Sequence, residues 1–361
     1  MHFHIGDLLD PALLAHSLDA GYVREQTHPT LPLRIFNYAE KAVFEREWNE
    51  VTRQCRGLVI DRQGRILARP YAKFFNYSEY PEGTFSLDDK VVVTDKLDGS
   101  LGILYPLPDG GYAIATRGSF ASDQALHATK IWQERYADTA SIKPGVTYLF
   151  EIIFPENRIV CDYGTLDDLV LLGGVDVATG TPLPADELPW DGPRADTFEF
   201  NTLADALAAA PRPGAEGFVL RVPGRDHTMI KIKQDDYVAL HRIITGLNAR
   251  AVWERLGAGD TVAEICEALP DEFHDWVKDV AADLTAQRDA ILADARSEHQ
   301  RILDGLPEGW TRKDYALPAS RSSMRAWLFM LLDDRDPSAR IFHTLRPEAD
   351  VRPVNTTEDN S

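Results

Sequence analysis

The sequence is poor in cysteine and has no long apolar run, and both absences narrow the class of protein. Its three cysteines, Cys55, Cys161 and Cys266, are odd in number and widely spaced, with no Cys-x-x-Cys pair. This pattern argues against a disulfide framework or a zinc site. The longest apolar run near the C-terminus, residues 326–332, is too short to cross a membrane. The first residues lack the basic and apolar regions of a signal peptide, so we expect a cytoplasmic protein without a membrane partner.

Positive charge is also scarce: 38 Lys and Arg stand against 57 Asp and Glu, giving a formal net charge of −19. Such a balance usually counts against a nucleic-acid partner, because phosphate contacts need Lys and Arg. The charges are unevenly distributed, however. Six basic residues and one acid lie between Thr52 and Lys73, whereas residues 260–298 carry eleven acids and three basic residues. We interpret the acidic stretch as a solvated helix face and the basic stretch as a possible wall of a binding site.

Strand patterns fill the middle of the chain, and helical patterns fill its last third. Residues 1–50, interrupted by prolines, look like a lead-in of short helical pieces. Expected strands are residues 57–60, 65–69, 90–95, 101–105, 112–116, 146–154, 168–175, 217–222 and 228–232, and expected helices are residues 122–136, 202–210 and 325–333. Apolar residues also recur at helical spacing between residues 273 and 291. These patterns predict an α+β fold: a domain of antiparallel sheets with flanking helices at residues 1–240, an all-helical domain at 241–345, and a disordered tail at 346–361.

One stretch is well suited to covalent chemistry. Lys96-Leu97-Asp98-Gly99 lies between two apolar β runs, residues 91–93 and 103–105, which we interpret as parts of a strand pair. A lysine attacks only when unprotonated, so its site must lower the lysine pKa with nearby cations or a metal. Asp98 could orient the lysine or a metal-bound water, and Gly99 would let the backbone approach a phosphate. The alternative is a hairpin turn with a surface lysine.

Four further charged residues occupy unusual places. Glu151 lies inside an apolar β run, where a carboxylate is costly unless it is paired or bound to a metal or ligand. Glu216 directly precedes a strand, and Lys231 and Lys233 share one face of another. The structural alternatives are that Glu151 pairs with an arginine, that Glu216 caps a turn, and that Lys231 and Lys233 face solvent. Together with Lys96, these residues make up the inventory for nucleotidyl transfer: a nucleophile, carboxylates for a divalent metal and cations for a polyphosphate.

The order of the motifs resembles that of the covalent nucleotidyltransferases, the superfamily of ATP-dependent ligases and capping enzymes. The similar stretches are Lys96-Leu97-Asp98-Gly99-Ser100, Phe150-Glu151, Glu216-Gly217-Phe218-Val219 and Lys231-Ile232-Lys233, which match motifs I, III, IV and V. More narrowly, residues 55–59, 69–76 and 116–119 resemble the phage T4 RNA ligase 1 family. The resemblance spans residues 36–241 and implies a nucleotidyltransferase domain of the ATP-grasp-like ligase type.

The resemblance implies an ATP-dependent RNA ligase. Lys96 would take AMP from ATP as a lysyl-AMP, pass it to an RNA 5′-phosphate, and a 3′-hydroxyl would then displace it. The implied catalytic residues are Lys96, Asp98, Lys231 and Lys233; the implied ATP-binding residues are Arg56, Lys73, Lys96, Arg117, Glu151, Val219, Lys231 and Lys233; and the implied ligands of Mg²⁺ or Mn²⁺ are Glu216 and Glu151. Val219 would pack on the adenine, and Tyr237 matches an aromatic position after motif V. Arg117 stands where the family commonly has a lysine, which keeps the charge but changes the donor geometry.

The implied partner is RNA with 3′-OH and 5′-phosphate ends, such as a broken tRNA under repair. The chain lacks the Gly-x-x-x-x-Gly-Lys-[Ser/Thr] phosphate loop, so a separate kinase or phosphatase would have to heal the ends. One alternative is another covalent nucleotidyltransferase, a DNA ligase or a guanylyltransferase. The region after Lys233 reads helical, where those enzymes place an OB-fold. The other alternative is an inactive descendant that only binds RNA ends, against which the complete motif set speaks.

Overall fold

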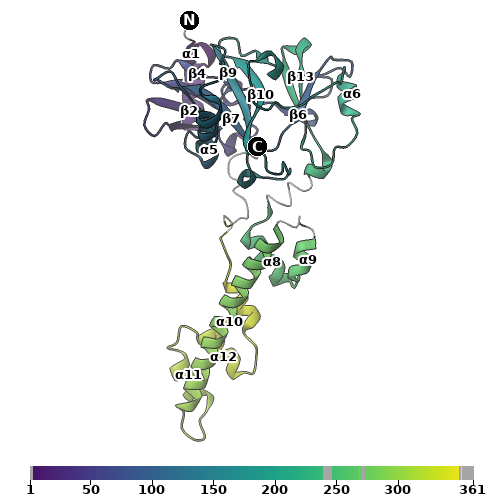
Figure 1. Cartoon of the computed structure of the whole chain (residues 1–361). Helices are drawn as coiled ribbons and strands as arrows, with labels where there is room; N and C mark the ends of the chain where they lie inside the picture. The colour runs from purple at the N-terminus through teal and green to yellow at the C-terminus, as the bar shows by residue number, and fades with distance from the viewer. Residues whose placement is uncertain (1–2, 239–245, 268, 270–272, 349–350, 352–361) are drawn as a thin grey trace. The chain divides into compact units, whose positions relative to one another are not determined.

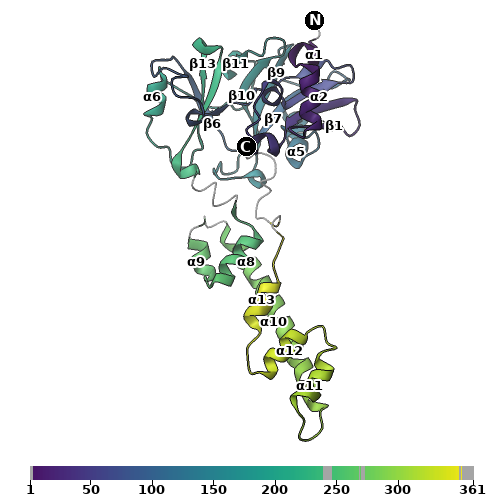
Figure 2. The ribbon, with the colours of Figure 1, turned by 180° about the vertical axis from the view of Figure 1, so that it is seen from behind.

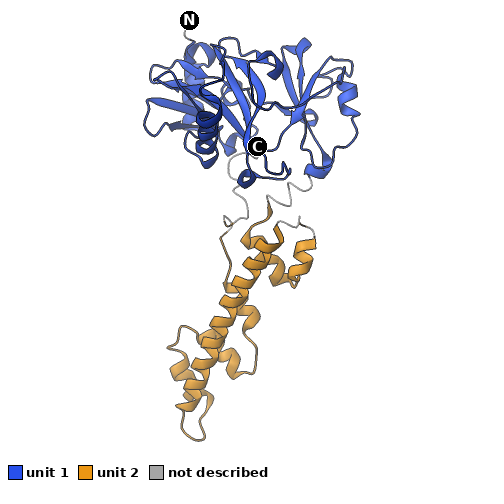
Figure 3. Ribbon diagram, in the orientation of Figure 1, with its two compact units in different colours: residues 1–241, 354–361 blue, residues 242–353 orange. Residues whose placement is uncertain are grey.

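The computed structural model describes residues 3–238, 246–267, 269, 273–348 and 351 (Figure 1). The chain divides into two compact units, one of which contains Met1–His241 and the other Arg242–Pro353 (Figure 3). The first unit consists of mainly antiparallel sheets with short helices, and the second unit consists of helices, which confirms the α+β class predicted from the sequence. Most of the expected disordered tail lies outside the described residues.

The described part of the first unit contains three sheets, in the strand orders β1-β2-β3-β4, β11-β10-β9-β7-β8 and β12-β6-β13-β14-β5. The first comprises β1 (Val23–Thr27), β2 (Leu33–Tyr38), β3 (Arg56–Asp61) and β4 (Ile66–Ala68). The second comprises β7 (Ser100–Pro106), β8 (Tyr112–Ala115), β9 (Val146–Ile153), β10 (Asp168–Asp176) and β11 (Pro182–Leu183). The third comprises β5 (Phe75–Asn76), β6 (Val92–Lys96), β12 (Thr197–Phe198), β13 (Gly217–Val222) and β14 (Thr228–Lys233).

Short helices connect and flank these strands. They are α1 (Ile5–Leu8), α2 (Pro11–Asp19), α3 (Glu40–Phe44), α4 (Glu50–Gln54), α5 (Asp123–Ile131) and α6 (Leu203–Leu207), with a π-helical turn η2 (Trp132–Tyr136) and the 3₁₀ turns η1 (Tyr77–Glu79), η3 (Pro155–Asn157), η4 (Ala185–Glu187) and η5 (Pro223–Arg225). The strands and helices predicted between residues 57 and 233 are confirmed as elements of the expected type.

The prediction that the two strands around Lys96 pair with each other is wrong. The two strands that flank the Leu97–Gly99 segment belong to different sheets: β6 lies between β12 and β13, whereas β7 lies between β9 and β8. Alternation along a strand reports which side chains share a face, but it does not identify the pairing partner. The partner of β6 comes about 120 residues later, with Gly217 opposite Lys96. The motif therefore passes from one sheet to the next.

The N-terminal lead-in is also more structured than expected. β1 and β2 pair antiparallel, and β2 pairs with β3 to complete the first sheet. Helix α2 lies beside β1 (Figure 2), and Val23, Phe36 and Val51 are buried in one core with Leu58. The sequence signal was weak because only the first residue of β1 is buried and the other four are exposed, so no alternation marks the strand.

The third sheet has one apolar face and one polar face. Val93, Phe218, Leu220 and Ile230 are buried in a common core. Since neighbouring side chains in a strand point to opposite faces, the intervening residues lie on the other face. These residues are Thr94 and Lys96 on β6, Val219 on β13, and Lys231 and Lys233 on β14. The alternation thus gathers the predicted lysines on one surface.

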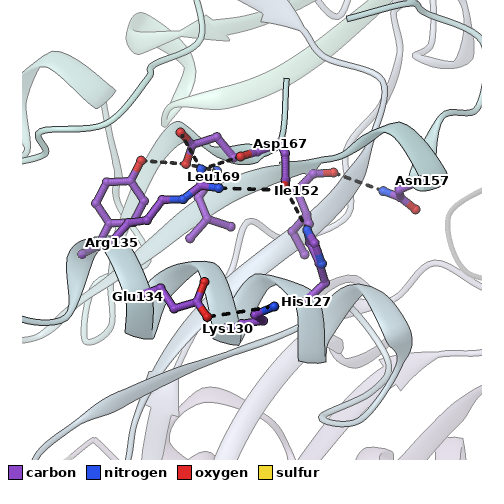
Figure 4. Close-up of polar contacts among 10 residues, drawn as sticks. His127, Lys130, Glu134, Arg135, Ile152, Asn157, Asp167 and Leu169 are labelled. Atoms are coloured by element: carbon purple, nitrogen blue, oxygen red, sulfur yellow. Dashed lines mark hydrogen bonds and ion pairs between the residues drawn. The ribbon is translucent and has the colours of Figure 1, made fainter. Parts of the chain in front are cut away.

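A set of polar contacts fastens α5 and η2 to the start of β10 (Figure 4). His127 Nε2 lies 2.7 Å from Asp167 Oδ1, and Arg135 donates to the carbonyl oxygen of Asp167 at 2.5 Å. Tyr136 donates to Asp168 Oδ1 at 2.6 Å. These contacts anchor the end of the β9–β10 connection, whose middle supplies main-chain donors to the site described below.

The second unit is built around one long helix. Its elements are α8 (Ala249–Ala258), α9 (Val262–Glu267), α10 (His274–Asp304), α11 (Arg312–Ala319), α12 (Arg325–Leu332) and α13 (Ser338–Thr344). The buried face of α10 includes Val277, Leu284 and Ile302, whereas acids such as Asp279 and Asp283 are exposed, which confirms the solvated acidic face. Among the described residues, no helix has both the length and the apolar character needed to cross a membrane.

Candidate active site

The centre of the candidate site is a carboxylate shared by two lysines. Gly217 pairs with Lys96 on one side and with Lys233 on the other, so the residue before it, Glu216, reaches both ammonium groups. Glu216 Oε1 lies 2.7 Å from Lys96 Nζ and 3.0 Å from Lys233 Nζ. The Glu216 side chain is only 3% exposed. Burial opposes its charge, but the two lysines outweigh that cost and hold the Glu216 pKa below its usual value.

Gly217 is needed for this arrangement. Its φ of +149° belongs to a region that side-chain-bearing residues rarely adopt. A Cβ on Gly217 would lie 2.0 Å from the carbonyl oxygen of Ile232, which no Cβ can do. The glycine therefore allows β13 and β14 to approach at the point where Glu216 meets Lys233.

The pKa of Lys96 differs from the expectation that neighbouring cations would lower it. Burial disfavours the charged amine, but the negative charge of Glu216 and then that of Glu151 and Asp98 outweigh burial. The pKa of Lys96 is therefore raised above its ordinary value. In the protein alone, Lys96 is a protonated partner of Glu216, and an attacking amine has to be released from that ion pair.

Lys231 carries the lowered pKa instead. Burial is the largest cause, and the positive charges of Lys73, Lys96, Lys233 and Arg56 act in the same direction. The pKa of Lys231 falls from 10.5 to about 6. The neighbouring cations thus help to keep Lys231 uncharged. A bound polyanion would offset the repulsion among these cations, so the cluster is suited to a polyanionic ligand.

Lys73 is held in an aromatic box that the sequence did not indicate. Its Nζ lies 5.1 Å from the ring centres of Tyr38 and Trp48 and 5.8 Å from that of Phe75, distances at which an ammonium is attracted to aromatic faces. The side chain is buried. Burial lowers the pKa of Lys73, while Tyr38 acts in the opposite direction. Tyr38 and Trp48 belong to the misjudged lead-in, so no motif pointed to them.

Two arginines stand near the same box. Arg117 Nη1 donates to the Tyr38 hydroxyl at 2.9 Å, and its guanidinium carbon lies 5.1 Å from the Tyr38 ring centre. Arg56 packs on Phe74 at 5.8 Å, and its Nη1 is buried without a hydrogen-bond partner among the described residues. A buried N–H group without a partner is costly. The Arg56 donor is therefore suited to an anionic ligand such as a phosphate oxygen.

Asp98 makes contacts different from those expected of it. Its Oδ2 accepts hydrogen bonds from the main-chain N–H groups of Val160 and Cys161, both at 2.8 Å, and Oδ1 accepts one from the Tyr237 hydroxyl at 2.8 Å. The Asp98 N–H donates to the Tyr163 hydroxyl at 2.7 Å. The carboxylate thus fixes the loop after β9 and the segment after β14, while its charge still acts on Lys96.

Glu151 contacts the backbone of the lysine motif. Its Oε1 accepts a hydrogen bond from the Gly99 N–H at 2.9 Å. A Cβ on Gly99 would lie 2.6 Å from the carbonyl oxygen of Ile152, so this crossing between the sheets needs a glycine. Val219 lies between Thr94 and Lys231 on the polar face of the third sheet and is partly exposed.

A half-buried lysine bound to a buried glutamate, with further cations from β3 and β14 nearby, is an arrangement suited to nucleotidyl transfer. The chain belongs to the RNA ligase family of the phage T4 RNA ligase 1 type, whose model, described as RNA ligase, matches residues 54–237. That range contains Arg56, Lys96, Glu216 and Lys233, together with the other residues of the site except Tyr38 and Trp48.

Individual relatives are more distant. A Thermovibrio ammonificans protein provisionally named an RNA ligase is 32% identical over 136 residues, which cover 36% of this chain and 35% of that protein. An uncharacterised protein, ORF64, of Ostreid herpesvirus 1 is 30% identical over 157 residues, covering 41% of this chain and 39% of the viral protein. The matched region thus spans little more than a third of the length of these curated relatives.

Solved structures with some likeness include an archaeal ATP-dependent RNA ligase, with a TM-score of 0.45 and 16% identity over 75% of this chain and 74% of that one. A Naegleria gruberi RNA ligase solved with pyrophosphate gives a TM-score of 0.33 and 19% identity over 43% and 52% of the two chains. Family membership rests on the family model and not on these structures.

Proposed function

We propose that this chain is an ATP-dependent RNA ligase that works through a lysyl-AMP on Lys96. The observation that carries the proposal is the Lys96, Glu216 and Lys233 ion triad beside the cations Arg56, Lys73 and Lys231. A protein without a polyanionic ligand has no evident need for so many cations in a part-buried cluster, because each raises the cost of charging the others.

Each residue has a role in the proposed first step. The phosphates of ATP would lie against Arg56, Lys73, Arg117, Lys231 and Lys233. Lys96 Nζ, once deprotonated, attacks the α-phosphorus; the N–P bond forms as the bond to pyrophosphate breaks, and the cations stabilise the charge that leaves. Val219 would pack on the adenine and Glu151 would bind the ribose. Asp98 acts by holding the surrounding loops in place.

A divalent metal fits this site only with help from the nucleotide. Among the described residues, no cluster of three His, Cys, Asp or Glu side chains could hold a metal ion. Mg²⁺ and Mn²⁺ commonly bind through one or two carboxylates together with phosphates and waters, which Glu216 and Glu151 can satisfy. When bound, such an ion would supply positive charge to the phosphates.

The later steps are proposed by analogy with the family. AMP would pass from Lys96 to the 5′-phosphate of an RNA, and a 3′-hydroxyl would displace it to form the phosphodiester bond. We propose repair of broken RNA, such as tRNA, in the cytoplasm as the setting, with a separate kinase or phosphatase preparing the ends. The helices described after β14 favour an RNA ligase over a DNA ligase or a guanylyltransferase, for which an OB-fold would be expected there.

The proposal is tested by incubating the purified protein with α-labelled ATP or GTP and a divalent metal, followed by denaturing gel separation. We expect label from ATP, and none with Lys96→Ala. Lys130→Ala is the matched control, because Lys130 is an exposed lysine of the same unit. Label from GTP would instead indicate capping chemistry. The absence of label from either nucleotide, in protein free of bound AMP, would leave an RNA-end-binding descendant as the better account.

A further inference from the structure

Resting on the proposed function, we propose that Arg212 is a positioning residue that sets the spacing of Lys96 and Glu216 from the opposite face of the sheet. Arg212 lies in the connection between α6 and β13, outside every motif singled out in the sequence. It is joined to the segments that carry Lys96, Glu216 and Lys233.

The contacts of Arg212 reach the residue adjacent to each of those three. Its Nη1 lies 2.9 Å from Asp95 Oδ1, and Asp95 precedes Lys96. The same nitrogen donates to the carbonyl oxygen of Gly217 at 3.2 Å, and Gly217 follows Glu216. The Arg212 N–H donates to Gln234 Oε1 at 2.9 Å. Gln234 follows Lys233, and its own N–H donates to the Glu216 carbonyl at 2.9 Å.

Aromatic rings fix the direction of the guanidinium. The Arg212 guanidinium carbon lies 4.5 Å from the ring centre of Phe198 and 5.0 Å from that of Phe218. The two rings pack edge to face with their centres 5.1 Å apart, and Phe218 is 1% exposed. Stacking on two fixed rings removes the rotational freedom that an arginine side chain otherwise has.

The strand register places these contacts behind the site. Phe218 pairs with Asp95, and both alternate with residues of the polar face, Lys96 on β6 and Val219 on β13. Side chains at successive positions point to opposite faces. Arg212 therefore does not touch a nucleotide bound on the Lys96 face, and it acts through the backbone of β6 and β13.

The chemistry explains why a fixed donor matters here. Lys96 must reach the reacting phosphorus after leaving Glu216, and a misplacement of about 1 Å can cost about a hundredfold in rate. The Arg212 and Asp95 side chains are 28% and 14% exposed. Forming their ion pair therefore removes part of the hydration of both charges, which costs free energy. Apolar packing would fill the same space, but it would not tie β6 to Gly217 at a fixed distance.

The test compares Arg212→Met with Arg225→Met. Arg225, in the turn η5 between β13 and β14, pairs at 2.5 Å with Asp89, which precedes β6. Its loss therefore removes a comparable ion pair at the end of the same sheet that is remote from Lys96. We expect Arg212→Met to slow single-turnover lysyl-AMP formation at saturating ATP by at least about tenfold, while the ATP concentration for half-maximal rate changes less than about threefold. Arg212→Lys should restore part of the rate, and Arg225→Met should leave it unchanged. A wild-type rate in Arg212→Met, or a loss confined to ATP affinity, overturns the proposal.

A second measurement does not depend on nucleotide chemistry. The acetylation of Lys96 relative to exposed Lys130 is followed by mass spectrometry in each variant at one pH, without nucleotide or metal. We expect Arg212→Met to make Lys96 acetylate several-fold faster, because the amine is no longer held at Glu216, and Arg225→Met to have no such effect. If wild-type protein takes no label from ATP, the proposed function fails and acetylation alone decides: unchanged Lys96 reactivity in Arg212→Met then overturns the role of Arg212.

Discussion

At Lys96, burial and charge act in opposite directions, and the charges decide. Glu216, Glu151 and Asp98 hold the amine protonated against the cost of burial. At Lys231, burial and then the surrounding cations both lower the pKa, to about 6. A polyphosphate bound among these groups would attract the protonated form of Lys231 and so raise its pKa. The same ligand would offer the cationic cluster a partner that competes with Glu216, which is one route to freeing Lys96.

Lys231 gives a prediction about protons. At pH 7.5, above its pKa of about 6, Lys231 is neutral in the free protein. A bound polyanion raises that pKa, so the protein takes up a proton when pyrophosphate binds. The affinity for pyrophosphate therefore falls as the pH rises above about 6. Calorimetry without metal in two buffers of different ionisation enthalpy measures the uptake.

Lys231→Met is the matched variant for this measurement, because it keeps the length of the side chain and removes the titrating group. The proton uptake should fall by up to one proton in Lys231→Met, since protonation of pyrophosphate itself cancels in the comparison. Equal uptake in wild type and variant would contradict the assignment of the lowered pKa to Lys231.

At the scale of the element, the alternation of buried and polar side chains along the strands of the third sheet places the site residues on one face. Residues that alternate with a buried core fall on one face, and Gly217 brings their strands close enough to share one carboxylate. The sequence allowed the strands and the shared face of Lys231 and Lys233 to be predicted, because alternation is written in neighbouring residues. It did not allow the partner of β6 to be predicted, because that pairing joins residues about 120 positions apart.

The same limit explains which site residues were missed. Tyr38 and Trp48 surround Lys73 but occur in a region whose first strand is almost wholly exposed, and Arg212 lies in a connection without a motif. Cation and aromatic contacts of this kind form only when distant segments pack together, so no local pattern records them. The motif lysines and glutamates, by contrast, were marked by their place in or beside apolar strands.

Gly217 gives the prediction at this scale. Gly217→Ala places a Cβ against the Ile232 carbonyl oxygen and should destabilise the first unit by about 2 kcal/mol or more, measured by urea unfolding. Gly214→Ala is the control, because Gly214 also has a positive φ, +78°, but nothing within 4 Å of an added Cβ. If both variants lose the same stability, backbone strain alone explains the effect and the close approach of β13 and β14 does not.

For the whole molecule, the net charge of −19 is the sum of unevenly distributed charges. The candidate site in the first unit brings Arg56, Lys73, Lys96 and Lys233 near Lys231, and two of these cations pair with the buried Glu216. The long helix of the second unit, by contrast, exposes acids. Electrostatic contacts with a polyanion depend on the local arrangement more than on the sum. An overall acidic composition is therefore compatible with ATP and RNA as ligands.

The most direct measurement of the central claim is to locate the adenylate. Wild-type protein is incubated with ATP and Mg²⁺ or Mn²⁺, digested, and its peptides are sequenced by mass spectrometry, with Lys96→Ala and Lys130→Ala in parallel. The account predicts one adenylyl group per chain on Lys96, present in Lys130→Ala and absent from Lys96→Ala. An adenylyl group on Lys231, Lys233 or any residue other than Lys96 would contradict it.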